Sequence, residues 1–228
     1  MRLVSASIVA GLAAALCASA ASAVIVPTYE IYGTQYGGTQ NMSYWATSPN
    51  LLTGSTVTGT VDYFGGTGTK LTDGDINSVT FYLNVPATVL IVLSAPSDIN
   101  QIRSMSGHLD DRVNQSYTIS YTAAASPTLT SSFTDIGTTL TIFPHATAGY
   151  DGTGNSVRAT FGDGTTSIVG GNTVTALKVV FNNLALLEDG SGTGGQPMYR
   201  EFEASVPEPA ALAVLGLSGL ALMRRRRA

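Results

Sequence analysis

The sequence has 228 residues, of which only 11% are charged, with a formal net charge of −4 and a single cysteine. Between Val24 and Val206 it carries fourteen acidic and six scattered basic residues, a net charge of −8. This distribution argues against nucleic acid as a partner, because phosphate binding needs clustered cations. The only cysteine, Cys17, lies near the N-terminus, so the remainder of the chain has neither disulfides nor thiolate chemistry.

Residues 1–23 are predicted to form a secretory signal peptide with an N-terminal signal helix. Arg2 precedes an apolar, alanine-rich stretch that ends near Ala20, and small residues follow as far as Ala23. A basic start, an apolar middle and an A-x-A site are the three parts of such a signal. We expect cleavage after Ala23, with cleavage after Ala20 as the alternative, so that an exported domain begins near Val24.

Residues 24–205 are predicted to form an all-β ectodomain. Short runs rich in β-branched and aromatic residues alternate with turn signals, and no stretch sustains a helical period over three turns. The predicted strands are Val79–Asn84, Ala87–Ser94, Ser116–Thr122, Thr138–Phe143, Val157–Phe161, Thr173–Phe181 and Tyr199–Ala204. Many short strands at this spacing indicate a β-sandwich or barrel.

Several segments of this domain resemble a discoidin, or F5/8 type C, domain. Tyr63–Ser78 contains an "LTDG" turn, Ala95–Thr122 resembles the middle of the family, and Ala176–Asn183 with Met198–Ala204 resembles its last two strands. The family's usual central tryptophan is missing, since the only tryptophan, Trp45, lies upstream. The resemblance implies a jelly-roll β-sandwich of eight or nine strands. Through the galactose-binding-like group it also implies a glycan, such as the cell's own exopolysaccharide, as the ligand.

The "KLTDGD" turn in the first of these segments is a candidate calcium site. In jelly rolls that resemble this one, the matching turn often holds a structural calcium ion close to the C-terminal strand. Asp73 and Asp75 flank Gly74, and together with Ser78 and Glu201 they could supply oxygens that calcium prefers. A plain turn, in which the Asp73 side chain accepts nearby backbone N–H groups, is the alternative.

A second candidate site is the segment "GHLDDR", which combines His108, Asp110, Asp111 and Arg112. Loops on a rigid sandwich commonly carry binding residues, so this segment is a candidate ligand loop. The alternative is a solvated turn in which Arg112 pairs with a neighbouring acid. No histidine metal spacing or nucleophile motif occurs in the chain, and we therefore expect a protein that is not an enzyme.

In the last segment, residues 206–228, a Pro-Glu-Pro triplet follows Val206. Fourteen uncharged residues (210–223) come next, and an arginine cluster precedes the final alanine. The uncharged part would make a helix of about 21 Å. It can cross the roughly 30 Å hydrocarbon core as a single transmembrane helix if arginines snorkel to the headgroups. The motif residues are Pro207, Glu208 and Pro209, and the arginines that stop transfer are Arg224, Arg225, Arg226 and Arg227.

This tail resembles the PEP-CTERM sorting signal of Gram-negative bacteria, which a membrane-embedded cysteine protease, exosortase, recognises. The resemblance implies that the protein is a substrate of exosortase. It would be anchored in the inner membrane before processing and would then reach the cell surface or the extracellular matrix. Binding of extracellular polysaccharide is the expected role there, and a structural matrix protein without a specific small ligand is the alternative.

Overall fold

The computed structural model describes residues 24–34, 50–60, 68–76, 80–81, 87–108, 115–140, 154–171, 173–182 and 198–206. Within these ranges the chain forms ten β-strands and a short 3-10 helix, η2 (Gly68–Leu71), and no α-helix. The predicted signal helix and the predicted transmembrane helix at 210–223 lie outside the described residues. None of the described helical segments is long and apolar enough to span a membrane.

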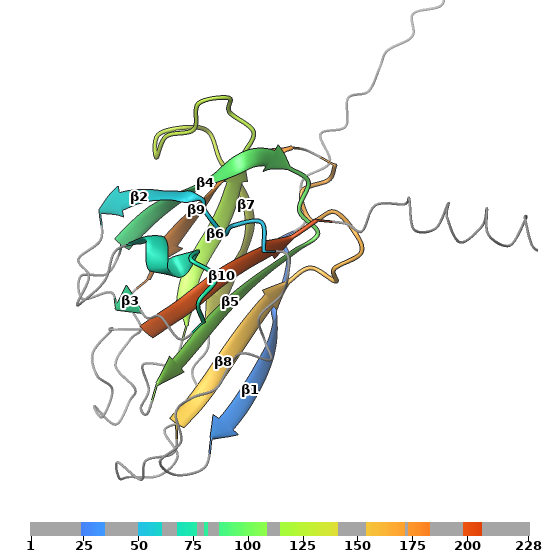
Figure 1. Ribbon diagram of the computed structural model, residues 1–228. Coiled ribbons are helices and arrows are strands. Elements are labelled where there is room, and N and C mark those ends of the chain that lie inside the picture. Colours follow the sequence, from blue (N-terminus) through green and yellow to red (C-terminus); the bar gives the residue numbers. More distant parts are fainter. Residues whose placement is uncertain are drawn as a thin grey trace, which may run out of the picture.

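The strands form two antiparallel five-stranded sheets (Figure 1). Sheet A has the order β1-β8-β5-β10-β3, and sheet B has the order β2-β4-β9-β6-β7. The strands are β1 (Thr28–Thr34), β2 (Thr56–Thr60), β3 (Thr80–Phe81), β4 (Ala87–Ser97), β5 (Gln101–His108), β6 (Ser116–Thr122), β7 (Thr134–Leu140), β8 (Gly154–Phe161), β9 (Val174–Phe181) and β10 (Met198–Ser205). The predicted all-β sandwich is confirmed, with ten strands in the described residues where the resemblance implied eight or nine. The strand pattern of the sequence did not mark β1, β2 or β5.

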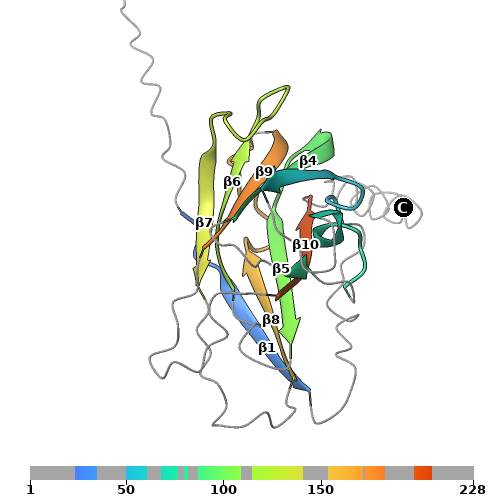
Figure 2. The same cartoon turned by 90° about the vertical axis from the view of Figure 1, so that its left-hand side faces the viewer.

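The strand register defines two ends of the sandwich. At the first, the terminal end, β5 begins at Gln101 opposite Ser205, the last residue of β10. At the second, the connection end, β1 ends opposite Gly154 and β5 ends at His108, opposite Asn155. Figure 2 shows the connection end at the bottom, where the arrowheads of β1 and β5 point. Since β1 begins and β10 ends at the terminal end, both described ends of the chain leave the sandwich there.

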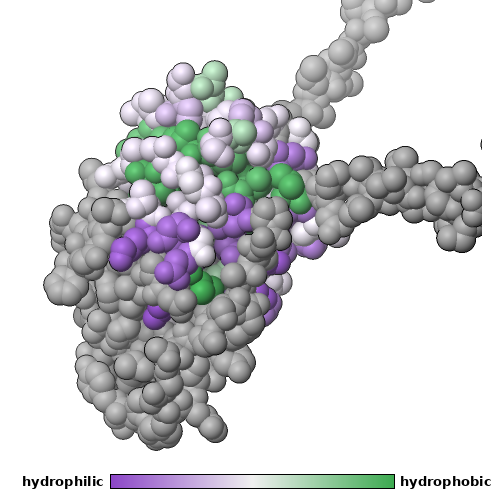
Figure 3. Space-filling model, in the orientation of Figure 1, coloured by the Kyte–Doolittle hydropathy of each residue, from purple (hydrophilic) through white to green (hydrophobic). Residues whose placement is uncertain are grey.

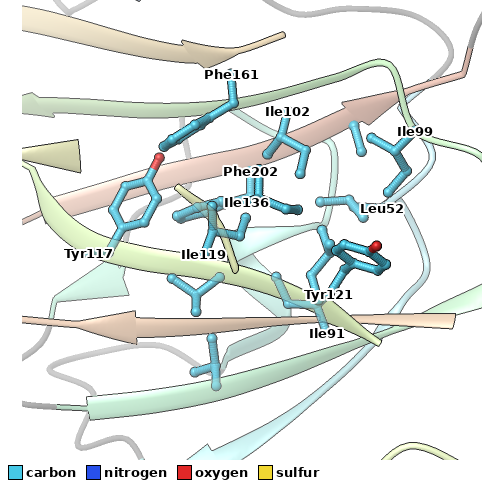
Figure 4. Packing of buried hydrophobic residues seen from close by; sticks show 14 of the residues in the cluster. Leu52, Ile91, Ile99, Ile102, Tyr117, Ile119, Tyr121, Ile136, Phe161 and Phe202 are labelled. Carbon is cyan, nitrogen blue, oxygen red and sulfur yellow. The ribbon is translucent and has the colours of Figure 1, made fainter. Parts of the chain in front are cut away.

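Aromatic rings from both sheets meet in the core. Tyr117 of β6, Phe181 of β9, and Tyr199 and Phe202 of β10 are fully buried, and the ring centroids of Phe181 and Tyr199 lie 4.7 Å apart. Tyr117 packs edge-on against Phe202 at 5.2 Å between centroids. Figure 4 shows these two rings among the aliphatic side chains between the sheets. Such tilted and edge-on pairs stabilise a core beyond the area that they bury.

Buried hydrogen bonds also join the two sheets near the connection end. The Ser104 hydroxyl on β5 lies 2.5 Å from the Tyr117 hydroxyl on β6 and donates a hydrogen bond to Gln115. The Tyr199 hydroxyl accepts a hydrogen bond from the Ser116 backbone N–H at 3.0 Å. Burial raises the pKa of both tyrosines, so both hydroxyls stay protonated. These bonds fix how sheet A sits on sheet B, since each buried polar group needs its partner.

Candidate functional site

The candidate site lies on the outer face of sheet A, where the segment after η2 covers β10. Phe202 and Ala204 point into the core, and the intervening Glu203 therefore points outward, as does Glu201. On this face Met105 of β5, the register partner of Glu201, packs against Ile76. The segment after η2 thus covers Glu201 of β10 with the turn that contains Gly74.

Glu201 is only 1% exposed. Its Oε1 accepts hydrogen bonds from Asn50 Nδ2 at 3.0 Å and from the Gly74 backbone N–H at 3.2 Å. Its Oε2 is buried, and apart from the side-chain hydrogen bond with Asp73 that helps to raise its pKa it has no partner among the described residues. Burial, followed by the nearby carboxylate of Asp73, raises the pKa of Glu201 to about 9. Without a cation the carboxyl group therefore carries a proton at neutral pH.

The turn that faces Glu201 is an Asx turn. Asp73 Oδ1 accepts a hydrogen bond from the Asp75 backbone N–H at 2.8 Å. Gly74 has a φ of 79°, which an L-residue rarely adopts, and this conformation directs its N–H toward Glu201. The turn therefore has the hydrogen bond that the plain-turn alternative predicts. The same turn also brings the Asp73 carboxylate close enough to raise the pKa of Glu201.

These residues fit a hard cation in part. Two neighbouring carboxyl groups, one of them buried, form a donor set of the kind that calcium prefers. Across the described ranges, no group of three or more His, Cys, Asp or Glu side chains is placed to hold a metal ion. A calcium ion here would depend on backbone carbonyls as well as on Asp73 and Glu201. Ser78, the fourth predicted ligand, lies outside the described residues.

Asn50 is the residue of this site that sequence reasoning missed. Its Nδ2 also donates to the Phe202 carbonyl at 3.2 Å, and its Oδ1 accepts from the backbone N–H groups of Leu52 at 2.9 Å and Ala204 at 3.1 Å. Asn50 therefore hydrogen-bonds β10 along the side opposite β5. No pattern around it distinguishes this asparagine from others in loops, because its partners on β10 are more than 150 residues away.

The other predicted site residues fall at the limits of the described chain. His108 is the last residue of β5, at the connection end, whereas Asp110, Asp111 and Arg112 lie outside the described residues. The motif residues 207–209 and the arginines 224–227 also lie outside them.

Charged side chains elsewhere on sheet A form ion pairs. Arg158 on β8 contacts both carboxylate oxygens of Glu30 on β1, at 2.7 and 2.6 Å. Arg103 on β5 lies 3.9 Å from Glu203 on β10, and burial lowers the pKa of Arg103. Figure 3 shows hydrophilic residues gathered across the middle of the face seen in Figure 1. Paired arginines and carboxylates support the sheet, and they form no nucleophile–base arrangement within the described ranges.

The C-terminal residues 205–227 match the family model of the PEP-CTERM protein-sorting motif. The chain carries a PEP-CTERM sorting motif. This motif indicates an exported protein that exosortase processes. The PEP-CTERM motif begins at Ser205, the last residue of β10, so no linker separates it from the sandwich.

No curated protein matches the chain in sequence. Among solved structures, the similar ones include carbohydrate-binding domains of the CBM32 and discoidin type. One is CBM32-1 from a family 31 glycoside hydrolase from Clostridium perfringens, with 12% identity, coverage of 68% of this chain and 96% of that chain, and a TM-score of 0.44. Another is the lectin domain of lectinolysin complexed with Lewis B antigen, with 13% identity, coverage of 71% and 99%, and a TM-score of 0.45. A third is chitosan-binding module 1 from a chitosanase/glucanase of Paenibacillus sp. IK-5, with 20% identity, coverage of 68% and 98%, and a TM-score of 0.42.

Proposed function

We propose that this protein is a non-catalytic β-sandwich that is exported, anchored in the inner membrane of a Gram-negative bacterium and then sorted by exosortase to the cell surface or extracellular matrix. The observation that carries this proposal is the PEP-CTERM motif directly after β10. The N-terminal signal peptide starts export, and the uncharged stretch at 210–223 spans the membrane. The four arginines that follow stay on the cytoplasmic side, as positive charges near membrane segments usually do.

The role proposed for the sandwich is binding of extracellular polysaccharide. Support comes from the discoidin-like segments, three of which form β5–β6, β9 and β10 of a two-sheet sandwich. The connection between β5 and β6 contains Asp110, Asp111 and Arg112 and follows His108, the last residue of β5. It leaves from the connection end, where strands with a buried aromatic core give it a rigid base. Binding through loops on such a base loses little conformational entropy in the scaffold.

A structural calcium ion between Asp73 and Glu201 is part of the proposal. The buried carboxyl group of Glu201 beside Asp73 supports it, because a cation there would replace the proton of Glu201 and would offset the repulsion between the two ionised carboxylates. The ion would join the turn to β10 and would stabilise the sandwich without taking part in a reaction.

Binding of the secreted protein to extracellular polysaccharide from its own host tests the proposed role. Saturable binding that a soluble fragment of the polysaccharide competes away is the expected result. Flat signals against host polysaccharide and across a glycan array would contradict glycan binding and would favour the structural matrix protein. Conversion of the full chain to a shorter form, only in cells that contain exosortase, tests the sorting part separately.

A further inference from the structure

Exposed apolar side chains gather at one end of the sandwich. The large hydrophobic residues that are exposed in the described ranges are Val24 at 64%, Val26 at 83%, Tyr29 at 38%, Leu129 at 39% and Val206 at 37%. The first three precede or begin β1, Leu129 lies in the connection from β6 to β7, and Val206 follows β10. Val24, Val26, Leu129 and Val206 belong to the terminal end, whereas the Tyr29 hydroxyl reaches along β7 to Thr139 and accepts a hydrogen bond from it at 2.9 Å. Apolar side chains concentrated on one part of a surface indicate contact with a partner or a membrane.

The terminal end also has no basic residue in its described connections. The β6–β7 connection, Ala123–Phe133, contains no charged residue, and the connections from β4 to β5 and from β8 to β9 contain only Asp98 and Asp163. Asp98 accepts a hydrogen bond from the Ser167 hydroxyl at 2.5 Å, and Asp163 accepts from the backbone N–H groups of Thr165 and Thr166.

The opposite end differs in sequence. The segments that join strand ends at the connection end (82–86, 109–114, 141–153 and 183–197) contain five acidic residues and one arginine. The exposed apolar residues of the described ranges therefore favour the terminal end as the side that meets a membrane.

The sorting tail leaves from the same end at short range. The Ser205 carbonyl accepts a hydrogen bond from the Asn100 N–H at 3.0 Å, and its hydroxyl donates to Asn100 Oδ1 at 2.9 Å. The backbone is thus fixed up to the residue at which the PEP-CTERM motif begins. The four residues after Ser205, which end at Pro209, can span at most about 14 Å, so the terminal end stays close to the point at which the tail enters the bilayer.

We infer that, before its tail is removed, the sandwich stands end-on on the membrane, with the terminal end against the lipid headgroups and the connection end pointing away. This rests on the proposed function, in which the tail is inserted in the bilayer. Val24, Val26, Leu129 and Val206 enter the interface. The described connections at this end contain no basic residue, and the ammonium group of Lys178 on β9 lies over the Phe133 ring, 4.1 Å from its centroid. The connection between β5 and β6 then faces outward, where a polysaccharide is met.

Single cysteines test this orientation, because Cys17 is the only cysteine of the chain. Full-length protein carrying Cys17→Ser is placed in vesicles of phosphatidylethanolamine and phosphatidylglycerol. A cysteine at Leu129 or Val26 reports the terminal end. A cysteine at Asn182 is the matched control, since this half-buried residue lies at the connection end, where its N–H donates to the Ser116 carbonyl at 2.9 Å. Each cysteine carries a fluorophore that a nitroxide on the lipid headgroup can quench.

We expect the label at Leu129→Cys and Val26→Cys to lose most of its fluorescence and the label at Asn182→Cys to lose none. The quenching should survive high salt, since it depends on apolar contact. Flotation with the vesicles is tested first. If the full-length chain does not float, the tail is not inserted in the bilayer, and both the proposed insertion and the orientation are wrong. If the chain floats while no label is quenched, or while Asn182→Cys is quenched as strongly as Leu129→Cys, the orientation is wrong and the proposed sorting is unaffected. If the label at Leu129→Cys is not quenched and this cysteine crosslinks to added exosortase, the terminal end contacts a protein and not lipid. That result would also overturn the inference.

Discussion

Replacement of Glu201 by glutamine should stabilise the calcium-free protein at pH 7. The folded chain keeps this carboxyl protonated to a pKa of about 9, whereas its ordinary value is 4.5. Because the unfolded chain releases the proton at pH 7 and the folded chain does not, the wild type loses about 3 kcal/mol of stability through proton linkage. Glutamine has the same shape and no charge. Glu201→Gln should therefore regain about 1–3 kcal/mol, the lower figure applying where its amide fits the Asn50 and Gly74 donors poorly.

The same linkage predicts a pH dependence with a definite sign. The contribution of Glu201 to wild-type stability is complete below pH 4.5 and is lost as the pH rises toward about 9. Glu201→Gln should lack this decline. Urea denaturation in EDTA, repeated between pH 5 and pH 9, measures the free energy of unfolding of both proteins. A variant that is less stable than wild type at pH 7, or that shows the same decline, would refute the protonated-carboxyl interpretation.

The same stability measurements in the presence of calcium test the proposed calcium site. A bound cation favours the ionised carboxyl group, so excess calcium should stabilise the wild type and flatten its pH dependence. Glu201→Gln should gain much less from calcium, and Asp73→Ala should gain nothing. If calcium leaves wild-type melting unchanged, and Asp73→Ala destabilises the protein equally with and without it, the turn is structural and binds no metal.

The remaining predictions concern β10 and the tail. Asn50→Ala removes four hydrogen bonds to Leu52 and β10, each worth about 1 kcal/mol, and should lower the free energy of unfolding by about 3–4 kcal/mol in urea denaturation. Asn182→Ala is the control, expected within about 0.5 kcal/mol of wild type, and an equal loss in both variants would contradict the role of Asn50. Alanine at Pro207 and Pro209 should leave full-length protein in the membrane of exosortase-containing cells, as immunoblots would show, because the prolines keep the backbone extended. Equal processing would remove the triplet as the recognised element. Glutamine in place of the arginines 224–227 should let a C-terminal reporter cross to the outer side of the membrane. A reporter that stays cytoplasmic would show that the arginines do not hold the tail in place.

The strands that the sequence predicts best are central ones with a strong apolar pattern. β6 runs from Ser116 to Thr122, the same limits that its pattern predicts, because it lies between β7 and β9 and nearly all of its side chains are buried. β7 begins at Thr134, four residues before the predicted start, since its first residues pair with β6 across a bulge that no pattern marks. β2 was not predicted. Its Gly59 is required because a Cβ there would come within 2.1 Å of the Thr88 carbonyl oxygen, a contact set by β4.

The site shows the same limit of sequence reasoning. The alternation around Phe202 places Glu201 correctly on the outer face of sheet A, where a charged residue is expected to be solvated. Its burial arises from the turn at Gly74 and from Asn50, which are 127 and 151 residues away in the chain. Spacing along a sequence carries no information about such pairs. The PEP-CTERM motif could be identified because its parts are contiguous, and its match to residues 205–227 confirms that prediction.

The position of β10 inside sheet A has a mechanical consequence. A protein attached to a cell surface through its C-terminus transmits every pull on a bound polymer to the last strand. β10 pairs with β5 from Gln101 to Ser106 on one side and hydrogen-bonds to Asn50 and Leu51 on the other. Tension on Ser205 acts along the strand, so these bonds resist together, in shear, whereas a strand at the sheet edge pulled sideways would peel away one bond at a time. The placement of the sorting motif after an interior strand thus suits the domain to an attachment that bears load.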